Sequence, residues 1–517
     1  MNLEERLVAL LGACPSMRVV LQIHAQVITN GLSKQPNFLT SRFIAFCSSS
    51  PLGDVRYARA VFDRVVRPSV FMWNSMIRGC SITGNLAAND GFSLYKRMHS
   101  ENEAKPNSFT FNFVLKSCAA AVAVEEGKEV HAHVAKSGCF WSPHIRTTMV
   151  SMYVKCGEVS DAQQAFDEMT ERSLVAWSAL VSGYASAGMT TKALDLFRDM
   201  QLAGVTPDEV TLVGVISACA QAGALKMGRW VHAYVEKRTV QLDVVLGTAL
   251  VDMYSKCGCI ETARQLFVEM PRRDTMLWTC MIMGLAAHGL ACDALEVFSQ
   301  MKLENVRQDA VTFIAVLSAC AHGGLVAEGK SCFDLMIKNG ISPQVEHYAC
   351  MVDLLCRAGQ VDEAYEFVRD MPLKPNAVMW RTLLVACRNS GNVTMGEAIG
   401  KCLLEAEPFS GENYVLFSNL YAACSRWEEV GIVRKMMKQR RVKANPGCSS
   451  VEIDGVVLEF LKWDESYPRA KELYSVLHHL MLAVRNGGYD EFRTSAVLRD
   501  IGDEGDFLSE RTAKRCF

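Results

Sequence analysis

Apolar residues recur along most of the chain at the three- and four-residue spacing of amphipathic helices. Within 174–208, the segments AWSALVSGYASAG and TTKALDLFRDMQLAG each have one apolar face and follow one another after a short turn. Residues 204–208, GVTPD, combine Gly, Pro and Asp, which favour turns because of their backbone geometry and short polar side chains. The pattern therefore predicts a unit of two helices and two turns over 174–208.

The same pattern returns at a fixed distance. Cys118, Cys219 and Cys320 lie 101 residues apart, and VSMYVKCGEVSDAQQAFDEM at 150–169 matches VDMYSKCGCIETARQLFVEM at 251–270. Within this period the units have lengths of 35, 35 and 31 residues. One such hairpin has too little apolar surface for a core of its own, so neighbouring hairpins must stack. The sequence predicts an all-α tandem array.

These repeats resemble the PLS subfamily of plant pentatricopeptide repeat proteins, from about Leu21 to Tyr489. The resemblance rests on the unit lengths and on strings such as MYVKCG, MYSKCG, AFDEM, LFVEMPRRD and VLSACAHGGLVAEG. It implies an α-α superhelix, a right-handed solenoid of helical hairpins, with a partial L repeat at 1–36. The ten full repeats it implies over 37–376 are 37–69 (S), 70–107 (P), 108–142 (L), 143–173 (S), 174–208 (P), 209–243 (L), 244–274 (S), 275–309 (P), 310–344 (L) and 345–376 (S).

The pattern changes after the last of these repeats. Residues 377–444 form two further apolar hairpins that resemble the E motifs that follow such arrays. In SSVEIDGVVLEFLK, two extended segments flank Asp454-Gly455, a dipeptide that favours hairpin turns, so a small β-hairpin is expected. A helix at about 467–486 follows. Residues 445–489 resemble the E+ region and the start of a DYW-type deaminase-like domain, and 490–517 a truncated tail.

The resemblance implies that the partner is single-stranded organellar RNA, read at one nucleotide per repeat. In the family, the fifth and the last residue of a repeat read the edge of the base, and the second residue wedges between neighbouring bases. The implied reading pairs are Ser41/Ser69, Asn74/Asn107, Asn112/Ser142, Thr147/Ser173, Ser178/Asp208, Val213/Asp243, Thr248/Asp274, Thr279/Asp309, Ile314/Gln344 and Ala349/Asn376. The implied wedges include Phe71, Phe109, Val175, Val210, Val245, Met276 and Val311.

By the family's code, Asn/Asn favours a pyrimidine, Thr/Asp and Ser/Asp favour guanine, and Thr147/Ser173 favours a purine. Val213 and Ile314 carry no hydrogen-bonding group, so their repeats are expected to read poorly. With the family's parallel polarity, and the last S repeat opposite the fourth nucleotide upstream of an edited cytidine, the expected target is Y-n-R-G-n-G-G-n-n-n-n-n-C.

Two alternatives remain open at these positions. Asp208, Asp243, Asp274 and Asp309 also suit the turn before a helix, where Asp caps the free N–H groups. Lys155, Lys256 and Arg357 occupy the thirteenth position of three S repeats. They form either a basic stripe for phosphates or an ordinary solvated face.

Composition narrows the classes of function. The net charge of −2 excludes a histone-like polycation, and 20 Cys and 25 Met are explained as core residues copied with the repeat. The recurring Cys, and His131 and His232, are expected to pack or to hydrogen-bond between repeats, so neither a metal nor a cofactor is predicted. The apolar run Thr275–Cys292 is divided between two helices by the register, which disfavours a membrane span. Residues 1–18 fit a transit peptide poorly, because they contain Glu4 and Glu5.

No catalysis is expected. Zinc-dependent deamination requires an H-x-E and a downstream P-C-x-x-C, and the chain contains neither. The stretch DFLSERTAKRCF carries Leu508 where a zinc histidine would stand, so Glu510 is at best a remnant. The leading hypothesis is a site-recognition factor for organellar C-to-U RNA editing that recruits editing cofactors and a deaminase in trans through the E region. The alternatives are an RNA splicing or stabilisation factor and a tetratricopeptide-type protein scaffold.

Overall fold

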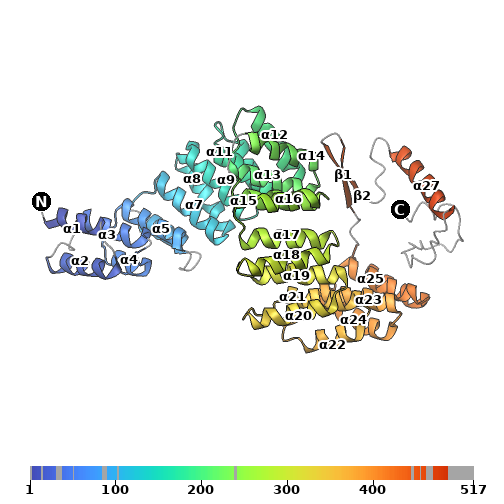
Figure 1. Cartoon of the computed structure of the whole chain (residues 1–517). Coiled ribbons are helices and arrows are strands. Elements are labelled where there is room, and N and C mark those ends of the chain that lie inside the picture. The colour runs from blue at the N-terminus through green and yellow to red at the C-terminus, as the bar shows by residue number, and fades with distance from the viewer. Residues whose placement is uncertain are drawn as a thin grey trace. The chain divides into compact units, whose positions relative to one another are not determined.

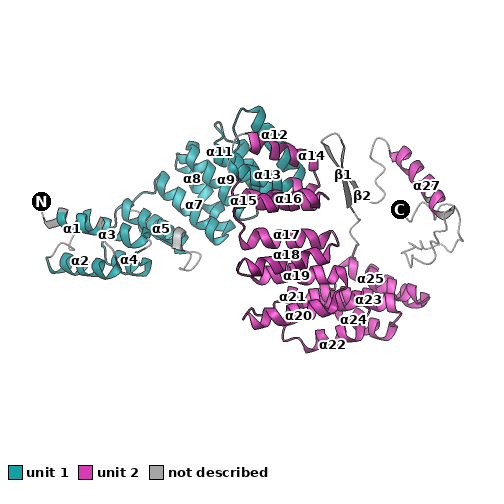
Figure 2. Cartoon of the chain, viewed as in Figure 1, with its two compact units in different colours: residues 1–218 teal, residues 219–517 magenta. Residues whose placement is uncertain are grey.

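The structure of the chain, a computed structural model, describes residues 3–12, 16–30, 38–50, 52–83, 90–101, 104–237, 242–443, 448–453, 456–461 and 470–486. Most of these residues lie in antiparallel helical hairpins (Figure 1). They form two units, residues 1–218 and residues 219–517, and the division falls within helix α13 (Figure 2). The predicted architecture of stacked helical hairpins is confirmed in both units.

The first unit contains the hairpins of the amino-terminal half. Its helices are α1 Leu3–Gly12, α2 Met17–Thr29, α3 Phe38–Ser49, α4 Val55–Phe62, α5 Val70–Thr83, α6 Asp90–Glu101, α7 Ser108–Ala121, α8 Val124–Lys136, the 3-10 turn η1 Cys139–Trp141, α9 Pro143–Lys155, α10 Val159–Asp167, α11 Leu174–Ser186, α12 Thr190–Leu202 and the greater part of α13 Glu209–Ala222. The sequence predicted only the second helix of a partial repeat near the amino terminus. The structure adds α1, whose Leu7 and Leu11 are buried.

The second unit continues the same pattern. Its helices are α14 Leu225–Lys237, α15 Val244–Lys256, α16 Ile260–Glu269, α17 Thr275–Ala287, α18 Ala291–Leu303, α19 Ala310–Gly323, α20 Val326–Lys338, α21 Val345–Arg357, α22 Val361–Asp370, α23 Ala377–Ser390, α24 Val393–Ala406, α25 Gly411–Ala423, α26 Trp427–Gln439 and α27 Ala470–Asn486. Strands β1 Cys448–Ile453 and β2 Val456–Leu461 pair antiparallel, with Val451 opposite Leu458. The predicted turn at Asp454-Gly455 lies outside the described residues.

The first helix of each hairpin packs against the first helices of its neighbours, as α3, α5, α7 and α9 do in the first unit and α15, α17, α19, α21, α23 and α25 do in the second. Because such a helix is covered on two sides, its sequence is apolar almost throughout. In α17, Leu277, Trp278 and Met281 are all fully buried. The second helices are more clearly amphipathic, since they cover only one flank of this layer. Among the described residues, no helix is long and apolar enough to cross a membrane.

Glycine marks the closest approach between neighbouring first helices. A Cβ built on Gly79 of α5 would lie 2.7 Å from the backbone oxygen of Ser48 in α3, which a side-chain rotation cannot relieve. Gly431 of α26, by contrast, has no atom within 4 Å of the corresponding point. The same substitution is therefore sterically blocked at one helical glycine and free at the other.

Gly79→Ala is expected to destabilise the protein by about 1–3 kcal/mol, the usual cost of overpacking. Gly431→Ala should instead stabilise it by about 0.5–1 kcal/mol, because alanine loses less backbone entropy than glycine in a helix. Urea denaturation followed by circular dichroism measures both. Equal shifts of the midpoint for the two variants would show that the close contact at Gly79 does not exist.

The histidines of the repeat connect neighbouring hairpins, as the sequence predicted. His131 Nδ1 lies 2.9 Å from the hydroxyl of Tyr153, and His232 Nδ1 lies 3.0 Å from that of Tyr254. Each bond joins the second helix of an L repeat to the first helix of the following S repeat. Burial lowers the pKa of His131 from its ordinary value, so the bond is made by a neutral imidazole at neutral pH.

Candidate nucleic-acid interface

The second residue is an exposed apolar side chain in most of the first helices, namely α5, α7, α11, α13, α15, α17, α19 and α23. Relative exposure is 50% at Phe71 and 69% at Met276, although both residues belong to otherwise buried helices. The other predicted wedge residues are exposed to a similar extent, namely Phe109, Val175, Val210, Val245 and Val311. These exposed apolar side chains recur at the same position of successive repeats. Such a row is suited to contact planar ligand groups such as bases.

In the P repeats, the fifth residue and the last residue are joined by a buried threonine of the next repeat. Ser178 Oγ donates to Asp208 Oδ1 at 2.9 Å, and Thr211 Oγ1 lies 2.6 Å from the same oxygen and 2.7 Å from Ser178 Oγ. The backbone N–H of Thr211 also donates to Asp208 Oδ1, at 2.9 Å. We call this arrangement a reading triad. The other two triads are Asn74, Asn107 and Thr110, and Thr279, Asp309 and Thr312.

The triads differ in how directly the two reading residues meet. Asn74 Nδ2 donates to Asn107 Oδ1 at 3.3 Å, so this pair touches. Thr279 Oγ1 lies 2.9 Å from Thr312 Oγ1, which in turn donates to Asp309 Oδ1 at 2.8 Å. This pair is therefore bridged by Thr312.

The triad leaves one carboxylate oxygen of Asp208 available. Three groups converge on its Oδ1, whereas its Oδ2 accepts no hydrogen bond from the described part of the chain. Burial alone raises the pKa of Asp208, but hydrogen bonds from Thr211 and Ser178 outweigh that effect and hold the pKa below its ordinary value. The result is an ionised, oriented acceptor suited to an N–H donor such as the edge of guanine.

The bridging threonines were not predicted from the sequence. Thr110, Thr211 and Thr312 are completely buried and lie 101 residues apart, as the third residue of each L repeat. A polar residue that recurs inside an apolar helix start, in SFTF, EVTL and AVTF, was the available signal. The S and P repeats of 143–173 and 174–208 carry Ile145 and Ala176 at the corresponding place, and so cannot form the same bridge.

Outside the P repeats, the structure brings some predicted pairs together and leaves others apart. The hydroxyls of Thr147 and Ser173 lie 2.9 Å from each other. Asn112 instead accepts a hydrogen bond at 2.8 Å from Thr148 of the following repeat. Ser142, its predicted partner, precedes α9 without a side-chain cap.

Thr248 and Asp274 are engaged separately. Thr248 Oγ1 donates to the backbone oxygen of Val244 at 2.7 Å, and Asp274 accepts from the N–H of Leu277 at 2.9 Å. Leu277 occupies the position of the bridging threonine, so no hydroxyl is available to join the pair.

Helix capping, the alternative left open by the sequence, is present as well. Asp243, Asp274 and Asn376 each accept the N–H of the third residue of the next helix. Asp309 and Asn107 do the same within capping boxes. Capping and pairing therefore coexist in the P repeats, because one carboxylate or amide oxygen serves both the helix start and the fifth residue.

Thr211→Val is expected to lower the free energy of unfolding by about 1–3 kcal/mol, because a charge-assisted hydrogen bond to Asp208 is lost. Since the pKa of Asp208 is depressed in the folded state, this penalty should be present at neutral pH and shrink as the pH falls through the folded pKa. Thr248→Val, which removes only a bond to its own helix, should change stability by about 0.5 kcal/mol or less. Comparable losses for both variants in urea titrations at pH 7 would contradict the triad.

Two of the three cations at the thirteenth position of S repeats are paired with carboxylates of their own helices. Lys256 Nζ lies 2.8 Å from Asp252 Oδ2, and Arg357 Nε lies 2.8 Å from Asp353 Oδ2. Both carboxylates occupy the ninth position of their repeats, one helical turn before the cation. The basic stripe is therefore masked at these two positions.

The third cation is different. The S repeat of 143–173 has Ser151 in the ninth position, and Lys155 is exposed without an ion pair among the described residues. Elsewhere, cations of one second helix pair with carboxylates of the next, as Lys128 does with Asp161 at 3.1 Å and Lys330 with Glu363 at 2.5 Å. Cations and carboxylates of neighbouring second helices are thus paired at these places, whereas Lys155 is left available for a phosphate.

Known families match most of this array. Models of the PPR repeat, the PPR repeat family and the pentatricopeptide repeat domain match 58–120, 145–174, 172–221, 248–275, 273–322, 311–341 and 339–372, and the E motif matches 391–452. Pentatricopeptide repeat-containing protein At1g59720, chloroplastic/mitochondrial, of Arabidopsis thaliana is 39% identical over 520 residues, which cover 98% of this chain and 81% of that protein. The chain belongs to the pentatricopeptide repeat family.

Other relatives and solved structures agree. The pentatricopeptide repeat protein CRR2, chloroplastic, of Arabidopsis thaliana is 35% identical and covers 97% of this chain and 76% of that one. The crystal structure of the pentatricopeptide repeat protein PPR10 from maize matches with a TM-score of 0.55 at 18% identity, over 85% of this chain and 73% of that chain. PPR10 in complex with an 18-nt psaJ RNA element matches with a TM-score of 0.51, also at 18% identity, over 84% and 64%. At this identity the likeness concerns the fold.

Proposed function

We propose that this pentatricopeptide repeat protein binds single-stranded RNA in an organelle and selects its site by sequence. The reading triads carry this proposal. Each triad fixes the side chains of a fifth residue and a last residue relative to one another, next to an exposed apolar wedge residue. This arrangement suits the reading of one base per repeat. The RNA complex of PPR10 and the chloroplastic and mitochondrial names of the relatives support the partner and the compartment.

In this proposal the repeats have the register predicted from the sequence, and the RNA runs parallel to the chain. The target is Y-n-R-G-n-G-G-n-n-n-n-n-C, with the first guanine opposite Ser178/Asp208. The preformed triads should discriminate most strongly, and the repeats of Val213 and Ile314 least. Thr248 and Asp274 can read guanine only if the base contacts both side chains, because no hydrogen bond in the described part of the chain joins them.

We further propose that the protein marks a site for C-to-U editing, with the deaminase supplied by another protein. The E motif match over 391–452 supports this role, because the hairpins that it covers follow the reading repeats. Transcript sequencing of both organelles in a knockout line tests it. Loss of editing at one or a few cytidines preceded by the predicted target is expected. Unchanged editing at every cytidine, with altered splicing or abundance of one transcript, would favour the splicing or stabilisation alternative.

A tetratricopeptide scaffold, the other alternative considered from the sequence, is not supported. The family matches are to pentatricopeptide repeats, and the alternation of 35- and 31-residue units departs from a constant period.

A further inference from the structure

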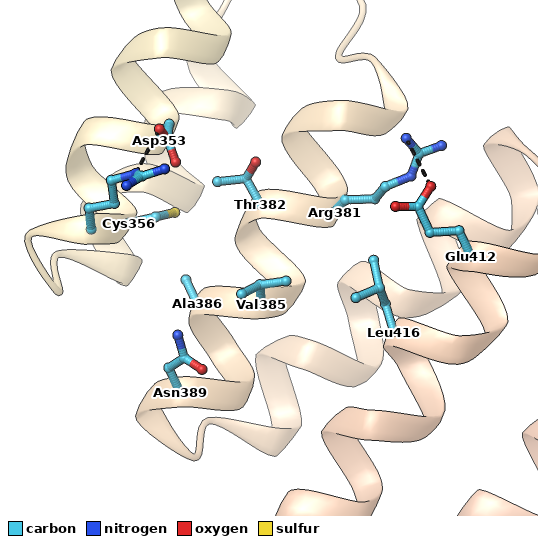
Figure 3. A pocket seen from close by; sticks show the side chains of 10 residues that line it. Asp353, Cys356, Arg381, Thr382, Val385, Ala386, Asn389, Glu412 and Leu416 are labelled. Atoms are coloured by element: carbon cyan, nitrogen blue, oxygen red, sulfur yellow. Dashed lines mark hydrogen bonds and ion pairs between the residues drawn. The ribbon is translucent and has the colours of Figure 1, made fainter. Parts of the chain in front are cut away.

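A pocket of about 440 Å³ opens among the first helices α21, α23 and α25, where the last predicted repeat meets the hairpins that follow it (Figure 3). Helix α23 runs through its middle and contributes Thr382, Val385 and Asn389. Arg357 of α21 and Leu416 of α25 lie on either side. The volume falls within the range of small-molecule sites, and the lining mixes apolar and polar groups.

The pocket continues the row of first helices that carries the reading residues in the second unit. Val378, the second residue of α23, is 53% exposed, like the wedges of the preceding repeats. The fifth residue is Arg381, where a reading residue would stand, but its Nε donates to Asn413 Oδ1 at 2.8 Å and its Nη2 to Glu407. The hairpin that begins with α23 thus has an exposed apolar residue at the wedge position but no free side chain at the fifth position. The pocket lies next to this fifth position.

The charges around the pocket are balanced. Arg357 is paired with Asp353 at 2.8 Å, and Arg381 is paired with Glu407 and lies 3.7 Å from Glu412. Burial raises the pKa of the Cys356 thiol to about 12, so this group also stays uncharged. A phosphate would meet carboxylates beside each guanidinium and gain little attraction. An uncharged ligand is favoured.

The remaining groups suit a flat ring with polar edges. Val385 and Leu416 are half-buried and offer apolar contact to a ring face. Asn389 Oδ1 accepts from the guanidinium of Arg388 at 3.1 Å, which leaves the amide N–H groups to donate. The hydroxyl of Thr382 donates to the backbone oxygen of Val378 at 3.1 Å, so its oxygen can still accept. The Asn389 amide can therefore donate to the edge of a nucleobase and the Thr382 hydroxyl can accept from it, while Val385 and Leu416 contact the face of the ring.

We propose that this pocket binds the base of the nucleotide immediately 3′ of the one opposite the last S repeat, 345–376. The site adds one recognised nucleotide to the target and lies between the reading repeats and the edited cytidine. The proposal rests on the RNA binding and polarity proposed above.

Fluorescence anisotropy on the full chain tests the proposal with three RNAs. The short RNA ends at the nucleotide opposite 345–376, the extended RNA carries one more nucleotide at its 3′ end, and the third has an abasic residue at that added position. The extended RNA should bind about tenfold tighter than the short and the abasic RNAs, which should bind alike. Equal binding of all three, or a gain that the abasic RNA retains, would overturn the pocket assignment.

Variants locate the effect. Two variants should reduce the gain in affinity from the added nucleotide to about one- to threefold. They are Asn389→Ala, at an exposed position, and Val385→Trp, which fills the pocket. Neither should weaken binding of the short RNA. Asn339→Ala, an exposed asparagine that ends α20 away from the pocket, should leave the gain intact. A gain that persists in Asn389→Ala would also overturn the assignment. If the short RNA binds no better than a scrambled RNA, the proposed function itself fails, whereas selective binding of the short RNA without a gain rejects only the pocket.

Discussion

Replacing Thr279 and Asp309 together by asparagine is expected to change the base preference of repeat 275–309 from guanine to a pyrimidine. The new pair would match Asn74/Asn107, while Thr312 would still be in place to bridge it. Asparagine also caps a helix start, as Asn376 and Asn107 do, so folding should be retained. Mobility-shift titrations with RNAs that differ only at the second guanine of the GG pair should show a loss of about 1–3 kcal/mol for guanine and a comparable gain for cytosine or uracil.

Asp243→Asn provides the matched control. The substitution is the same and falls at the same position of a repeat, but the fifth residue of that repeat is Val213, which has no polar group. Among the residues that the structure describes, Asp243 accepts a hydrogen bond only from the N–H of Leu246, at 2.8 Å, and asparagine can replace it there. The base preference should not change. A double variant that keeps its preference for guanine, or an equal shift caused by Asp243→Asn, would contradict the reading role of the triads.

Asp252→Asn is expected to strengthen RNA binding. The substitution removes the carboxylate 2.8 Å from Lys256 Nζ and leaves the ammonium group to face the RNA backbone. Affinity should rise several-fold at low salt. The slope of log affinity against log salt should steepen by about 0.7, the value for one more phosphate contact on a single strand. Fluorescence anisotropy over a salt series measures both quantities.

The chain offers the reverse experiment in another S repeat. Ser151→Asp places a carboxylate one turn before Lys155 and should reproduce the pairing seen at Lys256. Affinity should then fall and the salt slope should become shallower by a similar amount. Changes in the same direction for Asp252→Asn and Ser151→Asp would show that the thirteenth-position cations do not contact phosphates.

The helices and their order could be predicted because they follow from apolar periodicity and turn residues that recur every 101 residues. Helices α9, α11, α13, α15, α17, α19 and α21 begin at the first residue of an expected repeat. The predicted split of Thr275–Cys292 also holds, since α17 ends at Ala287 and α18 begins at Ala291. Local propensity was enough for these features, and the stacking of hairpins needed only the argument that a single hairpin lacks a core.

The interface was harder to predict because its decisive contacts join different repeats. The predicted pair Thr248/Asp274 looks equivalent to Thr279/Asp309 in the sequence, yet only the second is bridged. The difference comes from the third residue of the following helix, which is Leu277 in one case and Thr312 in the other. Arg381 is a similar case, because its partners Glu407 and Asn413 belong to the turn and helix that follow α24.

The ion pairs of Lys256 and Arg357 could have been predicted from the sequence. Asp252 precedes Lys256 by four residues, the spacing at which helical side chains form ion pairs, and Asp353 precedes Arg357 in the same way. Counting only cations at the thirteenth position left a basic stripe and a solvated face equally open. Including the ninth position separates Lys155 from the other two.

Binding of the unmodified protein to its predicted target tests the central claim most directly. The measurement is a mobility-shift titration with Y-n-R-G-n-G-G-n-n-n-n-n-C and with the same RNA in which GG is replaced by CC. The triad of Thr279, Asp309 and Thr312 predicts weaker binding of the CC RNA by about 1–3 kcal/mol, and a second loss of similar size follows if Thr248 and Asp274 also read their guanine. Equal affinity for the two RNAs would contradict sequence reading by these repeats.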